Sequence, residues 1–317
     1  MSDSSWGNFM KTAMAALLLM GVWASPSLGE QQGQRTFATP EEASKALYTA
    51  AQGNDEKALL ELLGPEGKEI VSSGNEAEDA QMRANFVKRY EEMNRLVKEP
   101  DGTVCLYIGA HNWPYPIPLV NKGGAWYFDT AAGKQEILFR RIGRNEISAI
   151  HICKELAEAE EEYYAQHQEY APKIFSDKGK ADGLYWKAGD NQPKSPIGPL
   201  VANAVYDDDS ANHGAPSAFR GYYFHALRAQ GENAQGGAKS YTAGGKATGF
   251  AFVAYPAEYR SSGVKTFVMS TDGVIYEKDL GVKTESVAKG MKEFNPGAGW
   301  KKTEVEMPST DATAKKQ

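Results

Sequence analysis

The stretch TVCLYIGAHNWPYPIPLVNKGGAWYFD, residues 103–129, decides the fold of the N-terminal part of the chain. It contains three strand-like apolar runs, Thr103 to Ile108, Ile117 to Val120 and Trp126 to Asp129. Lys122-Gly123-Gly124 lies between the last two as a turn, because glycine adopts the positive φ angles that tight turns require. We therefore expect a short antiparallel meander here.

Three amphipathic helices are expected before this meander. Thr39 suits the N-cap of the first helix, and Glu42 completes a capping box with it. Gly64-Pro65 ends the second helix. The third is expected from Ala77 to Val97, where apolar side chains recur every three or four positions.

Helices followed by a curled meander that ends in a Gly-Xaa-Trp-Xaa-Phe strand resemble the NTF2-like cone fold, here over residues 37–142. The resemblance implies a cavity between helices and sheet, used for catalysis in some members and for binding in many. The polar and aromatic residues expected near it are Tyr107, His111, Trp113, Tyr115 and Asp129. Two interpretations stay open: His111 and Asp129 form an acid–base pair, or the aromatic residues only pack around the neighbouring prolines.

A second unit is expected over residues 143–305, with a long helix from Asn145 to His167 and a final helix from Thr284 to Phe294. Between them lie a long loop, 171–220, and four strands, which we expect at 221–228, 247–255, 266–270 and 274–278. The helix and its exit resemble type IV pilins and pseudopilins. A pilin has its apolar helix at the mature N-terminus, whereas this helix is internal and charged, so the resemblance implies the shape rather than filament assembly. The fold class expected is α+β.

The N-terminus has the pattern of a secretory signal over residues 1–29. Lys11 precedes an apolar run, Thr12 to Ala24, that is shorter than the about 20 residues a membrane span needs. We expect cleavage, a periplasmic or secreted bacterial protein without stable membrane insertion, a polar linker at 30–36 and a disordered tail at 306–317.

Composition and motifs exclude several kinds of site. Asp and Glu (41) outnumber Lys and Arg (35), which argues against nucleic-acid binding. The five histidines are scattered, no phosphate loop or hydrolase motif is present, and we expect neither metal nor cofactor. Cys105 and Cys153 can either form a disulfide in an oxidising compartment or act as two small buried apolar residues.

Three further groups of residues are candidates for binding. Arg140, Arg141 and Arg144 can hold a carboxylate or phosphate, or pin the two domains together through Asp129, Glu136 or Glu146. The long loop and the strand after it carry aromatic residues that can line a peptide or sugar surface, among them Tyr185, Trp186, Tyr222 and Tyr223. The carboxylates at 158 and 160–162 suggest either a metal site or, as we favour, a solvated helix face.

Several long phrases along the chain resemble the bacterial DUF2950 family, over residues 36–302. They include TFATPEEA at 36–43, WPYPIPL at 113–119, WYFDTAAGK at 126–134, RRIGRNE at 140–146, DGLYW at 182–186, SPIGPL at 195–200 and GYYF at 221–224. The resemblance implies an exported bacterial protein and supplies no catalytic residues.

The sequence thus predicts a non-catalytic binding or scaffold module of the cell envelope, whose partner is an unknown envelope protein or a small ligand. A homodimer is one expected state, since cone folds often dimerise through the outer sheet. The alternative is a cryptic hydrolase or isomerase that uses the N-terminal cavity.

Overall fold

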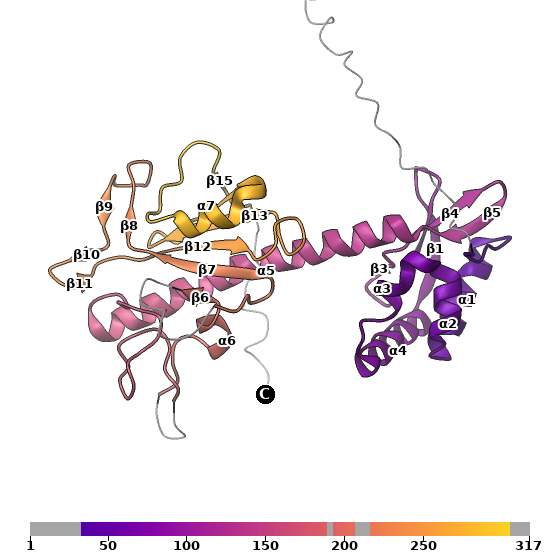
Figure 1. The fold of residues 1–317 in the computed structure, drawn as a ribbon, viewed down its shortest axis with the longest axis horizontal. Helices are drawn as coiled ribbons and strands as arrows, with labels where there is room; N and C mark the ends of the chain where they lie inside the picture. Colours follow the sequence, from indigo (N-terminus) through magenta and orange to yellow (C-terminus); the bar gives the residue numbers. More distant parts are fainter. Residues whose placement is uncertain (1–32, 189–192, 207–215, 305–317) are drawn as a thin grey trace, which may run out of the picture. The chain divides into compact units, whose positions relative to one another are not determined.

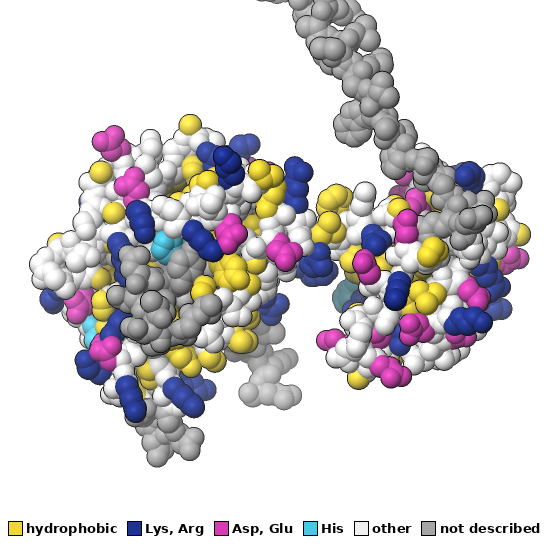
Figure 2. Space-filling view, in the orientation of Figure 1, with side chains coloured by type: hydrophobic (Ala, Val, Ile, Leu, Met, Phe, Trp, Pro, Cys, Tyr) yellow, Lys and Arg dark blue, Asp and Glu magenta, His cyan; other side chains and the backbone are white. Residues whose placement is uncertain are grey.

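The computed structural model describes residues 33–188, 193–206 and 216–304 and divides into two compact units, Met1–Lys134 and Gln135–Gln317. Each unit combines helices with antiparallel strands, so the predicted α+β class is confirmed (Figure 1). The expected signal at 1–29 and tail at 306–317 lie outside the described residues. Acidic and basic side chains are interspersed on the face of each unit that Figure 2 shows.

The first unit begins with short helices whose ends the sequence marks clearly. They are α1 (Pro40–Gln52), α2 (Glu56–Leu63), the 3-10 turn η1 (Pro65–Gly67), α3 (Lys68–Val71) and α4 (Glu76–Glu92). The Thr39 hydroxyl accepts a hydrogen bond from the Glu42 backbone N–H at 3.2 Å, and the Glu42 carboxylate accepts one from Ala38 N–H at 3.1 Å. The predicted cap of α1 is therefore confirmed.

The sheet of the first unit has the order β1-β2-β4-β5, with β3 paired to β2. Its strands are β1 (Asn94–Lys98), β2 (Val104–Ile108), β3 (Trp113–Pro114), β4 (Leu119–Lys122) and β5 (Ala125–Phe128). The three expected strands are present. The third helix was predicted too long, because it ends at Glu92 rather than Val97 and the residues after it form β1. Val97 pairs with Cys105 across a hairpin, so non-local backbone pairing overrides the helical spacing of the apolar residues.

Residues 33–36 belong to the first unit and are not a free linker. The Gln34 side chain is buried, and its amide donates 2.8 Å hydrogen bonds to the carbonyls of Leu62 and Phe128. Arg35 N–H donates to the Glu61 carbonyl at 2.8 Å. These bonds tie the chain entry to the end of α2 and to β5, which the polar composition of the segment does not indicate.

Helix α5 runs from Thr130 to His167, so it begins well before the expected Asn145. Asp129 caps it, since its carboxylate accepts a 3.0 Å hydrogen bond from Ala132 N–H. The boundary between the units, at Lys134, lies inside this helix, whereas the sequence suggested a boundary at 142. Gly133 and Gly143 disfavour helix locally, which explains the late predicted start.

A six-stranded sheet of order β15-β14-β13-β12-β7-β6 forms the centre of the second unit. Its strands are β6 (Val205–Tyr206), β7 (Tyr222–Leu227), β12 (Ala251–Pro256), β13 (Lys265–Ser270), β14 (Ile275–Asp279) and β15 (Lys301–Lys302). The four expected strands are confirmed with small shifts of their ends. The two-residue strands β8 (Ala229–Gln230) and β9 (Lys239–Ser240), and β10 (Thr242–Ala243) and β11 (Lys246–Ala247), form two further pairs.

Both faces of this sheet are covered. Phe252 and Ala254 of β12 pack into the core under α5, whereas Val253 and Tyr255 pack into a second core on the side of α7 (Thr284–Gly290) (Figure 1). Strand β12 is therefore buried at every position, as a strand between two layers must be. The remaining helical segments are α6 (Pro199–Ala202), within the long loop, and η3 (Gly281–Lys283).

The end of α7 differs from the sequence prediction, whereas the turn between β13 and β14 confirms it. Helix α7 ends at Gly290 rather than Phe294, because Phe294 N–H donates to the Ala229 carbonyl at 2.8 Å and the ring is buried in the second core. Thr271-Asp272-Gly273 joins β13 and β14 as expected, with Gly273 at a φ of 70°.

Candidate functional site

The first unit encloses a cavity of about 370 Å³ between its helices and the β2–β3 region. This volume lies within the range of small-molecule pockets, about 300–1,000 Å³. Most of the wall is apolar, and its apolar lining residues are Leu47, Ala51, Leu59, Leu63, Ile70, Val71, Met82, Phe86, Ile108, Trp113 and Pro116. Five residues with polar groups complete the lining: Asp79, Arg83, Asn85, Arg89 and Tyr115.

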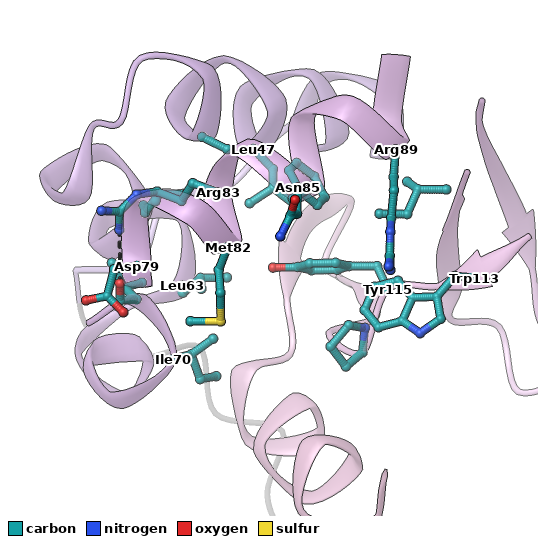
Figure 3. A pocket seen from close by; sticks show the side chains of 16 residues that line it. Leu47, Leu63, Ile70, Asp79, Met82, Arg83, Asn85, Arg89, Trp113 and Tyr115 are labelled. Atoms are coloured by element: carbon teal, nitrogen blue, oxygen red, sulfur yellow. Dashed lines mark hydrogen bonds between the residues drawn. The ribbon is translucent and has the colours of Figure 1, made fainter. Parts of the chain in front are cut away.

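Helix α4 covers the cavity without closing it. Of its residues only Asp79 is buried, whereas Met82 keeps 55 % of its surface exposed and Phe86 is half-buried. Met82, Phe86 and Arg89 follow one another at intervals of four and three residues, so they share one face of the helix. This face is turned toward the cavity (Figure 3). A ligand in the cavity would therefore bury apolar surface that the protein alone leaves partly exposed.

Tyr115 brings a hydroxyl group into this apolar space. Its backbone N–H donates to the Leu106 carbonyl at 2.7 Å, and its ring packs edge-on against Phe86 and Phe128, at centroid distances of 5.5 and 6.4 Å. The hydroxyl points into the cavity (Figure 3) and has no hydrogen-bond partner among the described residues. Burial raises the pKa of Tyr115 above its usual value, so the group stays a neutral donor and acceptor.

Asn85 lies opposite Tyr115 on α4. Its Oδ1 accepts a 3.2 Å hydrogen bond from the Gln81 side chain, and its amide group is directed toward the Tyr115 side of the cavity (Figure 3). Amide N–H groups donate only. Asn85 and Tyr115 together offer a small polar region in an otherwise apolar wall.

Asp79 and Arg83 form a rigid corner at one end of the cavity. Both carboxylate oxygens of Asp79 accept hydrogen bonds from Ser73 N–H, at 3.1 and 3.0 Å. Hydrogen bonds from Ser73 and the charge of Arg83 hold the pKa of Asp79 below its usual value, against the opposite effect of desolvation. Arg83 in turn donates to Asn54 Oδ1 and, at 3.2 Å, to the Val71 carbonyl. This pair fixes α3 against α4 and is occupied by protein contacts.

Arg89 lies at the other end, with its guanidinium over the face of Trp113 at 5.7 Å from the ring centroid (Figure 3). Both side chains are exposed, and Trp113 keeps 37 % of its surface. In the part of the chain that the structure describes, Arg89 has no ion-pair partner within 4 Å.

Of the residues expected around the cavity, the structure places Trp113 and Tyr115 in its wall. His111 and Asp129 are not among the lining residues, and the Asp129 carboxylate caps α5 instead. The Tyr107 hydroxyl donates to Glu99 at 3.3 Å. Of the two interpretations left open, the pair of His111 and Asp129 is therefore not formed in this cavity, because the Asp at the end of β5 is used as a helix cap.

The three arginines on α5 do not converge on one site. Arg140 pairs with Glu136 at 2.7 Å within the helix, and Arg141 donates to the Ser261 carbonyl at 3.2 Å. Arg144 is exposed. Glu146 is engaged elsewhere, since its carboxylate accepts hydrogen bonds from Val264 and Lys265 N–H at 2.9 and 3.0 Å. The contacts of Arg140 and Arg141 are those of structural residues.

The four aromatic residues predicted to line a surface of the second unit do not lie on one common surface. Tyr222 is wholly buried, with its hydroxyl donating to the Lys265 carbonyl at 2.9 Å, so its expected place on a binding surface is wrong. Tyr223 points to the opposite face of β7 and packs on Tyr255, at 5.8 Å between centroids, because side chains alternate along a strand. Tyr185 packs edge-on against Phe175 at 5.8 Å, and the Trp186 indole donates to the Pro193 carbonyl at 3.0 Å.

Neither cysteine is in a disulfide: Cys105 is half-buried in β2, and Cys153 lies in the core under α5, where burial raises its pKa to about 12. The interpretation as two separate thiols therefore holds in this structure. Glu160 is buried as well, whereas Glu158, Glu161 and Glu162 are exposed, so the solvated face expected for the acidic stretch of α5 is corrected at Glu160 only. No group of three metal-ligating side chains is found among the described residues.

A family model with the description "Protein of unknown function (DUF2950)" matches residues 34–303. The chain belongs to the DUF2950 family. This range takes in both units, and it includes the whole cavity and the buried Gln34. No curated protein and no solved structure was found to match the chain. Within the described residues of this DUF2950 protein, no helix has the length and apolar character of a membrane span.

The sequence did not single out the polar residues of α4. Asn85 and Arg89 are four positions apart, beside the apolar positions Met82 and Phe86. A polar residue flanking an apolar stripe at this spacing is the available signal, but it is also typical of any helix at the edge of a core. Asn85 and Arg89 become candidate binding residues only because Tyr115 and Trp113 lie across the cavity from them.

Proposed function

We propose that this DUF2950 protein is an exported, non-catalytic binding module of the bacterial cell envelope, and that the cavity of its first unit binds a small, mostly apolar molecule. The observation that carries this proposal is the apolar cavity of about 370 Å³ with the Tyr115 hydroxyl and the Asn85 amide directed into it. An apolar site with few polar groups is the usual composition of small-molecule pockets.

The arrangement of helices over an antiparallel sheet around a cavity supports an NTF2-like shape for the first unit. In the second unit, one long helix packed against a sheet that is antiparallel except for the short parallel pair β6–β7 supports a pilin-like shape. We propose that the second unit contacts an envelope partner while the first binds the ligand. The signal-like pattern at residues 1–29 supports export, and the composition of that segment supports its cleavage.

The proposal is tested by native mass spectrometry of the protein purified from its native host under gentle conditions. We expect a stoichiometric small molecule on the wild-type protein and an intact mass that lacks the signal. The same spectra report whether the protein is a homodimer. Met82→Trp fills the exposed mouth of the cavity, and we expect at least about a ten-fold loss of the bound fraction, since the indole would occupy the ligand's space.

Lys88→Trp is the matched control, because Lys88 is exposed on the same helix and does not line the cavity. It should carry the same ligand as wild type. Retention of the ligand by Met82→Trp places the ligand elsewhere and contradicts the cavity assignment. A wild-type protein that carries no small molecule, and takes up none of the probes named below, contradicts the binding function itself.

A further inference from the structure

The two arginines that line the cavity differ in what they contact. Arg83 donates to Asn54 and to the Val71 carbonyl, and it lies beside the ionised Asp79, so its charge is compensated. Arg89 contacts the Trp113 face at 5.7 Å and has no carboxylate within 4 Å among the described residues. The cavity therefore has a neutralised end at Asp79 and a positively charged end at Arg89.

Among the described residues the Arg89 guanidinium makes no hydrogen bond, so its N–H donors are available beside the Trp113 contact. The N–H groups of a guanidinium lie in its plane and match the two oxygens of a carboxylate. The indole removes water from one side of the cation, which strengthens a charge-assisted hydrogen bond at the edge. The partly open mouth of the cavity, beside Met82, keeps this position accessible to a ligand.

We propose that the ligand of this cavity is an amphipathic monocarboxylate, whose apolar body lies against Leu59, Leu63 and Met82 and whose carboxylate is bound by Arg89. This inference rests on the proposed function. A neutral apolar molecule would fill the cavity equally well but would leave Arg89 without an anion. The compensated pair of Asp79 and Arg83 at the far end offers no free cation for a second carboxylate, so the charge of the ligand is at one end only.

Two probes of matched chain length separate the effect of charge from the effect of apolar burial: decanoate and 1-decanol. We expect the wild-type protein to bind decanoate about 10- to 100-fold more tightly than 1-decanol in titration calorimetry. This is the ratio of affinities that one charge-assisted hydrogen bond produces. The preference should decrease with added sodium chloride, because exposed charges are screened. Naphthalene-2-carboxylate, compared with decanoate, distinguishes an aromatic acid from a fatty acid.

Arg89→Met keeps an apolar stem and removes the charge. It should lower the affinity for decanoate about ten-fold or more and leave that for 1-decanol unchanged. Arg89→Lys keeps a point charge and should retain part of the preference. Lys88→Met is the matched control, since Lys88 is exposed on α4, carries the same charge and does not line the cavity. Its affinities should equal those of wild type, and circular dichroism confirms that each variant is folded.

The outcomes separate this inference from the proposal beneath it. Equal wild-type affinities for decanoate and 1-decanol, both reduced by Met82→Trp, would overturn the carboxylate and leave the cavity as a binding site. The same loss of decanoate preference in Lys88→Met and Arg89→Met would assign the effect to general charge rather than to Arg89. No binding of any probe, together with no copurified molecule, would overturn both.

Discussion

Glu160 is a carboxyl group held inside the core of the second unit, with 3 % of its surface exposed. It accepts a 2.8 Å hydrogen bond from Ala171 N–H, but burial dominates and raises its pKa to about 8. An acid whose folded pKa is raised binds its proton more tightly in the folded state. Its contribution is therefore complete below the ordinary pKa of 4.5 and is lost as the pH rises toward about 8.

Glu160→Gln removes this titration while keeping the acceptor for Ala171 N–H. We expect the free energy of unfolding of wild type, relative to Glu160→Gln, to fall by about 1 kcal/mol or more between pH 5 and pH 8. Urea unfolding at the two pH values measures it. Glu162→Gln, exposed on the same helix, should show no such change relative to wild type. A wild-type advantage that grows with pH would mean that Glu160 is ionised in the fold.

At the scale of single residues, the sequence offered Trp113, Tyr115, His111 and Asp129 as candidates near a cavity, and the lining contains Trp113 and Tyr115 but not His111 or Asp129. The sequence left open whether the histidine and the aspartate form a chemical pair. The hydrogen bond from Ala132 N–H instead commits Asp129 to the start of α5. Whether a polar side chain is used for chemistry or for capping depends on which backbone donors lie beside it, and that is a property of the folded chain.

The start of helix α5 shows how packing overrides propensity within one element. A Cβ at Gly133 would lie 2.6 Å from Cγ1 and 3.0 Å from Cβ of the buried Ile117, whereas nothing lies within 4 Å of a Cβ at Gly143. Alanine is about 1 kcal/mol better than glycine in a helix interior. Overpacking costs about 1–3 kcal/mol. Because only a Cβ at Gly133 would clash, this cost outweighs the gain in helix propensity at Gly133 and is absent at Gly143.

We expect Gly133→Ala to lower the free energy of unfolding by about 1 kcal/mol and Gly143→Ala to raise it by about 0.5–1 kcal/mol. Urea midpoints of the two variants against wild type measure this. Adding Ile117→Val to Gly133→Ala should recover part of the loss, because the shorter side chain, which lacks Cδ1, can turn away from the new Cβ with fewer clashes of its own. Equal gains at both glycines would show that Ile117 can move aside without cost.

Other elements show the limit of local patterns in the same way. The residues of β1 satisfy both a helical spacing and a strand, and only the pairing of Asn94–Lys98 with Val104–Ile108 decides between them. Strands β7, β12 and β13 of the second unit were predictable because both of their faces are buried, which makes them nearly continuous apolar runs.

At the scale of the whole molecule, the two units have separate hydrophobic cores, although α5 runs through both units. We expect the separate cores, rather than the continuous helix, to decide whether the units unfold together. Among the described residues, the buried side chains of one core all lie between Phe37 and Phe128, and those of the second unit's cores all lie between Ala149 and Phe294. The sequence indicated two units from chain length, and it placed the boundary late because it did not show α5 crossing it. A shared helix does not by itself join two cores that have no residue in common.

We therefore expect the two units to open separately, and a pair of identical truncations tests this. Leu106 is buried in the first core and Leu156 in the second, so Leu106→Ala and Leu156→Ala should each lower stability by about 2–5 kcal/mol. Amide hydrogen exchange read by mass spectrometry then reports where the loss falls. Leu106→Ala should weaken protection in α1, α2 and β2 and leave β12 and β13 unchanged, and Leu156→Ala should do the reverse.

If either truncation lowers the protection of both units equally, α5 transmits unfolding and the chain is one cooperative unit. Separate opening would mean that the cavity of the first unit can bind and release the proposed ligand while the second unit stays folded.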